Sequence, residues 1–234
     1  MQIKIGARTV GDGCRPFFIA EISGNHNRSL QTALEIVERA AQSGADAIKL
    51  QTFTPDTLTL DSHRPEFFID DQQSAWHGMR LWELYGQAYT PWEWHDPIFS
   101  RARELGLACI SSAFDRKSVE FLDRLNADAI KIASFELIHL PLIRDAASLG
   151  RPIVVSTGMA SRGEIEEAVE SVRGTGNSQL VLLKCTSAYP ASAEDANLAT
   201  MADLRRCFGC LVGLSDHTMS SAVAVAAVAL GACV

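Results

Sequence analysis

Short apolar runs alternate with longer amphipathic segments along most of the chain. The apolar runs predict short buried strands at residues 16–22, 47–53, 107–112, 129–133, 152–156, 179–185 and 211–214. The segments between most of them repeat apolar residues with the helical period, which predicts helices at residues 30–42, 118–125, 140–149, 162–173, 201–207 and 220–230. The chain therefore alternates strand and helix, as α/β proteins do.

The spacing of the strands indicates a barrel. A further apolar run begins at Ala232, and strand starts recur mostly about every 20 to 30 residues, the spacing of a βα unit. Eight such strands predict a (β/α)8 TIM barrel over residues 1–234, with its eighth strand cut short and with residues 1–15 as an N-terminal β-hairpin cap. A doubly wound open sheet is the competing architecture, but residues 21–27 lack the glycine-rich phosphate loop typical of it.

Three strands carry a lysine toward their C-terminal ends, namely Lys49, Lys131 and Lys184. Burying an ammonium group costs several kcal/mol unless an anion meets it. We therefore expect these strand ends to converge on one anionic ligand. Lys184 has a second interpretation, as an outward or solvated residue, and we assign it no catalytic role.

Polar residues follow seven consecutive strands, where a barrel places its functional groups. They are Glu21; Lys49 and Gln51; Ser111 and Ser112; Lys131, Ser134 and Glu136; Ser156 and Thr157; Lys184, Thr186, Ser187 and Tyr189; and Ser215, Asp216 and His217. This coincidence favours an enzyme with its site at the carboxyl ends of the strands.

Composition and charge exclude several classes. A formal charge of −7 argues against a general nucleic-acid or membrane-surface binder. No run approaches the roughly 18 apolar residues that a membrane span needs, and no signal peptide is recognisable. The six cysteines are scattered, so we expect reduced thiols and a cytoplasmic protein. Cys207 and Cys210 form a CxxC without a second pair, which we interpret as chance spacing.

A long insertion, residues 54–90, separates the second strand from the next helix. It contains Trp76, His77, Arg80, Trp82 and Tyr85. Loops of this length in compact domains are commonly functional, and the aromatic content favours an ordered lid over the substrate. The alternative is an extra helix packed on the outside of the barrel.

Several motifs resemble those of the nonulosonate synthase family, whose members condense phosphoenolpyruvate with an amino sugar. They are residues 20–27 (AEISGNHN), 48–53 (IKLQTF), 131–136 (KIASFE), 156–159 (STGM), 184–190 (KCTSAYP) and 213–218 (GLSDHT). The resemblance covers essentially the whole chain. Residues 88–95 and 194–198 are most similar to the pseudaminic acid branch, which implies 2,4-diacetamido-2,4,6-trideoxy-L-altrose as the sugar; N-acetylneuraminate and legionaminate synthases are the alternatives within the family.

The resemblance implies roles for particular residues. Lys49 and Lys131 correspond to the cationic clamp for phosphoenolpyruvate, and Ser112, Ser134 and Ser187 to short hydroxyl donors, although sialic acid synthases often carry Thr and Asn at the first and last of these. A phosphate and a carboxylate do require fixed cations and donors. Glu21 corresponds to a carboxylate near the sugar or a water. Gln51, Glu136 and Tyr189 correspond to sugar-binding positions.

The resemblance also implies a divalent metal, Mn²⁺ or Mg²⁺ and possibly Co²⁺, with His217 as a ligand. The metal would polarise the sugar aldehyde so that C3 of phosphoenolpyruvate attacks it. In the family a Glu-x-His segment supplies a second metal histidine and an antifreeze-like domain follows; both would fall beyond Val234, which leaves the activity of this chain by itself an open question. A homodimer is expected for the full-length protein.

Several of these residues have a structural interpretation as well. A single histidine after a strand, such as His217, is often only hydrogen-bonded. Asp216 either supports the neighbouring His217 site or caps the helix from Ser220, and we expect the cap. Asn25, His26 and Asn27 are either turn-formers or contacts. His95 is expected at the surface or in the lid, and Gly158 is expected to serve backbone geometry.

Two other function classes remain open at this point. A Schiff-base aldolase would use Lys131 or Lys184 as the nucleophile toward a ketone. A catalytically inactive sugar-binding barrel is the third hypothesis, because the second metal histidine is missing.

Overall fold

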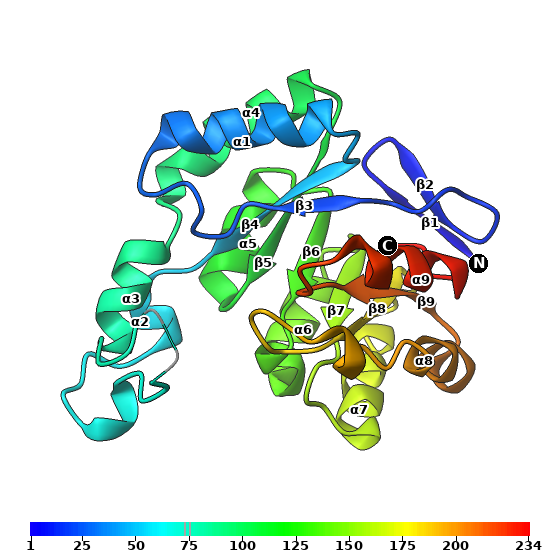
Figure 1. The fold of residues 1–234 in the computed structure, drawn as a ribbon. Coiled ribbons are helices and arrows are strands. Elements are labelled where there is room, and N and C mark those ends of the chain that lie inside the picture. Colours follow the sequence, from blue (N-terminus) through cyan, green and yellow to red (C-terminus); the bar gives the residue numbers. More distant parts are fainter. Residues whose placement is uncertain (73, 75) are drawn as a thin grey trace.

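The computed structural model describes residues 1–72, 74 and 76–234. Two antiparallel strands, β1 (Gln2–Ile5) and β2 (Arg8–Gly11), form an N-terminal hairpin. The described residues then form a seven-stranded parallel sheet in sequential order: β3 (Ile19–Glu21), β4 (Ala47–Thr52), β5 (Ala108–Ala113), β6 (Ala129–Ile132), β7 (Ile153–Ser156), β8 (Leu180–Cys185) and β9 (Leu211–Ser215). The sheet is curled, and helices lie on its outer side (Figure 1).

A helix follows most strands, as the periodicity predicts. These helices are α1 (Leu30–Gln42), α4 (Trp92–Glu104), α5 (Arg116–Arg124), α6 (Leu140–Ala147), α7 (Arg162–Arg173), α8 (Thr200–Phe208) and α9 (Ser221–Ala229). Short 3₁₀ turns η2 (Phe135–Ile138) and η3 (Ala193–Asp195) follow β6 and β8. Within the described residues, none of the helices has the length and apolar character needed to cross a bilayer.

Strand alternation divides the core into two layers. Ile48, Leu50 and Ile130 belong to the outer cluster against the helices. An inner cluster contains the residues that precede two of these, Ala47 and Ala129, together with Ile3, Ile5 and Val10 of the hairpin. The hairpin therefore closes the end of the barrel at which the strands begin, and the predicted fold class and hairpin cap are confirmed.

The residues predicted to begin an eighth strand, 232–234, carry no strand assignment. They nevertheless bond to both edges of the sheet: the Cys233 amide donates to the Val212 carbonyl at 2.9 Å, and the Phe17 amide donates to the Cys233 carbonyl at 2.9 Å. Gly213 makes room for this segment, because a Cβ there would lie 2.2 Å from the Val234 carbonyl oxygen. The chain end thus bridges β9 and the approach to β3.

The insertion contains α2 (Pro55–Leu58), the 3₁₀ turn η1 (Pro65–Phe67) and α3 (Leu81–Ala88), and it projects from one side of the barrel (cyan, Figure 1). Arg80 pairs with Asp61 at 2.7 Å and with Glu83 at 2.8 Å. The ring of Tyr85 packs edge-on against Phe53 at 5.9 Å. These contacts join described parts of the insertion to one another and attach α3 to the barrel just after β4.

Candidate active site

A cavity of about 530 Å³ lies at the carboxyl ends of the strands. Eight of the ten predicted site residues line it: Glu21, Lys49, Gln51, Ser112, Lys131, Ser134, Tyr189 and His217. They come from β3 to β6 and from the segments that follow β6, β8 and β9. The two lysines and the histidine, which are far apart in sequence, therefore face one space.

Lys131 is the most buried charged group of the cavity, at 4% exposure. Its Nζ donates to the Ser156 hydroxyl and to the Ile132 carbonyl, both at 2.6 Å. Burial, together with the positive charge of Lys49, lowers the pKa of Lys131 to about 7. Ser156, to which we assigned no role, is thus the nearest side-chain partner of this amine.

Lys49 and Glu21 are adjacent across the β3–β4 register and form an ion pair. The Lys49 Nζ also lies 3.5 Å from the Ser112 hydroxyl of the next strand. Because Ser112 pairs in register with Lys131 on β6, the two lysines flank one serine along the inner wall. An anion placed here would meet two ammonium groups and a hydroxyl donor.

His217 is oriented by a backbone carbonyl of Thr186, the residue directly after β8. Its Nδ1 lies 2.9 Å from the Thr186 carbonyl oxygen, which can only accept, so Nδ1 carries the proton. The neutral ring then has its lone pair on Nε2. The Tyr189 ring packs against the imidazole with centroids 4.3 Å apart.

Cys185 also lines the cavity, although its sequence context does not mark it as a site residue. Its Sγ lies 4.0 Å from His217 Nδ1 and 3.9 Å from the Ser187 hydroxyl. Burial raises the pKa of the Cys185 thiol, but hydrogen bonds from His217, Ser134 and Ser215 outweigh it and bring the pKa to about 6. Hydrogen bonding to Cys185 in turn raises the pKa of His217.

Gly158 brings the loop after β7 against two of the predicted serines. A Cβ at this position would lie 2.4 Å from the Ser187 hydroxyl oxygen and 2.9 Å from that of Ser134. The residue is therefore needed for close approach between chain segments. This is a more specific reason than the backbone geometry predicted for it.

Two predicted residues do not line the cavity. Ser187 lies behind it, next to Cys185 and Gly158. Glu136 is half-buried on η2, and its Oε2 is buried without a hydrogen-bond partner among the described residues. Burial raises the pKa of Glu136, while Lys131 and His139 act against that shift.

For Lys184 the outward interpretation is confirmed and convergence on the cavity is not, while the expectations for Asp216 and His95 are wrong. Lys184 faces away from the cavity: it is one position out of register with Leu183 and Cys185, and its Nζ donates to the Thr186 hydroxyl at 2.6 Å. Asp216 does not cap the last helix, because Ser220 does so and Asp216 accepts from the Thr218 amide. His95 is fully buried.

Both alternatives for Asn25, His26 and Asn27, a contact with the cavity and a role in a turn, occur in the loop after β3. Asn25 lines the cavity. His26 is buried, with Nε2 3.2 Å from the Thr90 hydroxyl, while Asn27 adopts a positive φ of 48°. The loop therefore combines a cavity residue, a packing residue and a turn residue in succession.

The donor set fits a divalent metal only in part. In the described part of the chain, no three His, Cys, Asp or Glu side chains gather closely enough to hold an ion. His217 offers one imidazole nitrogen, whereas sites built from protein ligands use three or more. The described residues therefore supply one ligand and do not by themselves complete a metal site.

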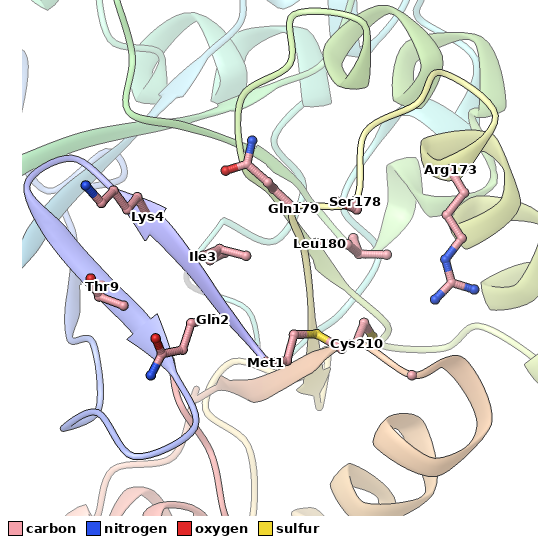
Figure 2. Close-up of a pocket in the computed structure, with 11 residues that line it drawn as sticks. Met1, Gln2, Ile3, Lys4, Thr9, Arg173, Ser178, Gln179, Leu180 and Cys210 are labelled. Atoms are coloured by element: carbon pink, nitrogen blue, oxygen red, sulfur yellow. The ribbon is translucent and has the colours of Figure 1, made fainter.

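A second cavity, of about 640 Å³, lies at the opposite end of the barrel between the hairpin and the starts of β8 and β9. Figure 2 shows Lys4 and Arg173 on opposite sides of it, with Met1 and Cys210 between them. None of the predicted site residues lines this cavity. The chemistry-bearing groups are thus concentrated at the carboxyl ends.

The curled parallel sheet and its lysine-lined mouth define the class: an α/β barrel protein suited to hold a small anionic molecule. Residues 36–234 match the model described as the NeuB family. The chain therefore belongs to the NeuB family.

Individual relatives agree with this assignment. The chain is 45% identical over 217 residues to "Pseudaminic acid synthase" of Helicobacter pylori. The aligned residues cover 93% of this chain and 63% of that relative. The chain is 38% identical over 234 residues to "N,N'-diacetyllegionaminic acid synthase" of Legionella pneumophila, covering 98% of this chain and 65% of the relative. The chain thus spans somewhat less than two thirds of the length of these proteins.

A solved structure has the same fold. The crystal structure of the N-acetylneuraminic acid (sialic acid) synthetase of Leptospira borgpetersenii superposes with a TM-score of 0.86 at 27% identity. The superposition covers 100% of this chain and 76% of that protein. The likeness supports a sialic-acid-synthase type of barrel.

Proposed function

We propose that this protein condenses phosphoenolpyruvate with 2,4-diacetamido-2,4,6-trideoxy-L-altrose to give pseudaminic acid and phosphate. One observation carries the proposal: Lys49 and Lys131, from different strands, line a single cavity beside serine hydroxyls. The 45% identity to the H. pylori protein, spread over 93% of this chain, favours the pseudaminic acid branch.

The cavity residues are assigned to the two anionic ends of phosphoenolpyruvate. Lys49 and Lys131 neutralise its phosphate and carboxylate, and Ser112 and Ser134 donate hydrogen bonds to them. Gln51 and Tyr189 orient the sugar at the cavity rim. Ser187 and Glu136, which are both partly exposed, keep their proposed substrate contacts.

The reaction forms one carbon–carbon bond and breaks one carbon–oxygen bond. C3 of phosphoenolpyruvate attacks the aldehyde carbon of the open-chain sugar, and the aldehyde oxygen takes up a proton to become a hydroxyl. Water adds to C2 of the resulting cation, and phosphate leaves from C2 as the ketone forms. Lys49 and Lys131 hold the phosphate as its negative charge increases, and Glu21 holds the sugar or the incoming water.

A divalent metal is part of the proposal. His217 would be its ligand from the described residues, through Nε2, because Nδ1 is committed to the Thr186 carbonyl. When bound, Mn²⁺, Mg²⁺ or Co²⁺ would supply Lewis-acid polarisation of the aldehyde oxygen.

The proposal is tested by measuring phosphate release from phosphoenolpyruvate with the full natural gene product and a panel of amino sugars. We expect release with the diacetamido-trideoxy altrose, formation of the nine-carbon acid, and loss of both on chelation. Legionaminate or N-acetylneuraminate as the product would move the assignment to another branch of the family. Absence of release with every sugar would refute the synthase.

A second candidate function, a Schiff-base aldolase, is favoured by the chemistry of Lys131. A buried amine with a pKa near 7 is a suitable nucleophile for a carbonyl at neutral pH. Borohydride added with a ketone substrate would trap a lysine adduct in an aldolase. In the proposed synthase no adduct forms, and Lys131 stays a cation toward phosphoenolpyruvate.

A further inference from the structure

Three buried polar side chains form a hydrogen-bonded row on the outer face of the sheet, behind the cavity. They are His95 of α4, Thr52 at the end of β4 and Ser111 of β5, each at 0% exposure. The Thr52 hydroxyl oxygen lies 2.9 Å from His95 Nε2 and 2.6 Å from the Ser111 hydroxyl oxygen. We call these three residues the outer relay.

The direction of the hydrogen bonds follows from one carbonyl group. His95 Nδ1 lies 3.2 Å from the Pro91 carbonyl oxygen, which can only accept, so the ring proton is on Nδ1. Nε2 then accepts from the Thr52 hydroxyl, whose oxygen accepts from Ser111. Burial lowers the pKa of His95 to about 4, so the ring is neutral and the relay keeps this direction at neutral pH.

The outer relay joins the two strands whose other faces build the cavity wall. On β4 and β5, Gln51 pairs in register with Ser112, and each is adjacent in sequence to a relay residue. Lys49 on the same inner face lies 3.5 Å from the Ser112 hydroxyl. A shift of one strand end against the other would therefore move the lysine, the glutamine and the serine relative to one another.

The relay begins where the insertion ends. Pro91 follows the insertion directly, and Thr90 is held by His26, whose ring packs edge-on against Trp94 at 5.5 Å. The chain entering α4 is thereby connected to the cavity wall through hydrogen bonds of fully buried side chains. Fully satisfied buried networks of this kind fix one arrangement of the elements that they join.

We propose that His95 is a positioning residue, which acts through Thr52 and Ser111 to hold Gln51, Ser112 and Lys49 at the spacing that phosphoenolpyruvate requires. The inference rests on the proposed function, because it assigns the relay to that same cavity. None of the three relay residues lines the cavity, so their effect is indirect.

Replacing Thr52 tests the relay with little change in shape. Thr52→Val keeps the branched side chain and removes the hydroxyl, and we expect kcat/KM for phosphoenolpyruvate to fall by about tenfold or more. Thr52→Ser restores the hydroxyl and should recover most of the activity. Ile48→Val is the matched control: it lies on the same face of β4, is equally buried and belongs to no hydrogen-bonded row.

The comparison separates positioning from general destabilisation. The proposal is overturned if Thr52→Val retains wild-type kcat/KM while its midpoint of unfolding falls as far as that of Ile48→Val, or if Thr52→Ser is as impaired as Thr52→Val. A low kcat/KM in Thr52→Val alone, rescued in Thr52→Ser, supports it.

A structural measurement keeps the test independent of the reaction. If the wild-type protein releases no phosphate with any sugar, the synthase assignment fails, and crystal structures of the wild type and Thr52→Val decide the relay. An increase in the Lys49–Ser112 or Gln51–Ser112 separation in the variant supports positioning. Unchanged separations refute it.

Discussion

Lys131 has a charge that depends on what occupies the cavity. Its Nζ is buried between a serine hydroxyl and a main-chain carbonyl, and the nearby Lys49 adds repulsion. Both effects favour the neutral amine, whereas a bound phosphate favours the ammonium. Ligand binding and protonation at this residue are therefore linked.

This linkage gives a testable pH dependence. With a pKa of about 7, free Lys131 loses its proton as the pH rises through 7, so phosphoenolpyruvate must return a proton to it on binding above that pH. We expect net proton uptake at pH 8 and affinity that weakens by up to about tenfold per pH unit above 7. Calorimetric titration in two buffers of different ionisation enthalpy measures the uptake.

Two substitutions check that the proton belongs to this lysine. Lys131→Met should abolish both the uptake and the pH dependence of affinity. Lys184→Met should leave both unchanged, because Lys184 faces the opposite side of the sheet. Equal uptake in the wild type and Lys131→Met would contradict the assignment.

Among the elements, the strands and helices follow from the sequence because apolar periodicity is a local property. Helix α1 begins and ends where the pattern of Leu30 to Gln42 predicts. The inward and outward faces of β8 do not follow, because all six of its residues are buried on one side or the other. The sequence therefore leaves the direction of Lys184 open and gives no reason to select Cys185: the lysine lies on the outer face and the cysteine in the cavity.

The expectations for His95 and Asp216 are wrong for a different reason. The environment of His95 depends on where the chain returns after residues 54–90, which no local pattern encodes. Asp216 lies near the start of α9, but Ser220 is closer and accepts from the Ala222 amide. Cavity residues were predicted well where the strand end itself places them, as with Lys49, Lys131 and His217.

The turn after β7 offers a prediction at the level of elements. Gly158→Ala would place a Cβ against the hydroxyls of Ser134 and Ser187 and push both aside. We expect phosphoenolpyruvate affinity to fall about tenfold or more, with a loss of about 1–3 kcal/mol in stability. Calorimetry and urea unfolding measure the two effects.

Gly163→Ala is the control for this change. It lies in α7, and a Cβ there meets no atom within 4 Å. Alanine favours a helix over glycine by about 1 kcal/mol, so stability should rise slightly and affinity should stay the same. Wild-type affinity in Gly158→Ala would show that the two serines do not contact the ligand.

Over the whole molecule, Asp46 ties the N-terminal hairpin to the barrel. Its buried carboxylate accepts from Arg8 of the hairpin at 2.5 Å, from Arg15 at 2.6 Å and from the Phe18 amide at 2.9 Å. Arg8 belongs to β2, Arg15 follows the hairpin, and Phe18 directly precedes β3. The closed end of the barrel is thus held by ionic contacts as well as by apolar packing.

Neutralising this carboxylate should destabilise the protein without affecting the cavity. Since both arginines are partly exposed, we expect Asp46→Asn to cost about 1–2 kcal/mol in urea unfolding and to leave phosphoenolpyruvate affinity unchanged. Asp203→Asn, which removes an exposed pair with Arg206, should cost at most about 1 kcal/mol. Equal losses in the two variants would contradict a special role for Asp46.

The hydrogen bond between His217 and the Thr186 carbonyl has an evolutionary consequence. Its acceptor belongs to the peptide backbone, so a side-chain replacement at position 186 leaves the acceptor in place. The tautomer of the imidazole therefore depends on the backbone position after β8 and not on the side chain at residue 186. Homologues that differ freely at this position should keep the same ring nitrogen available, provided that the loop keeps its course.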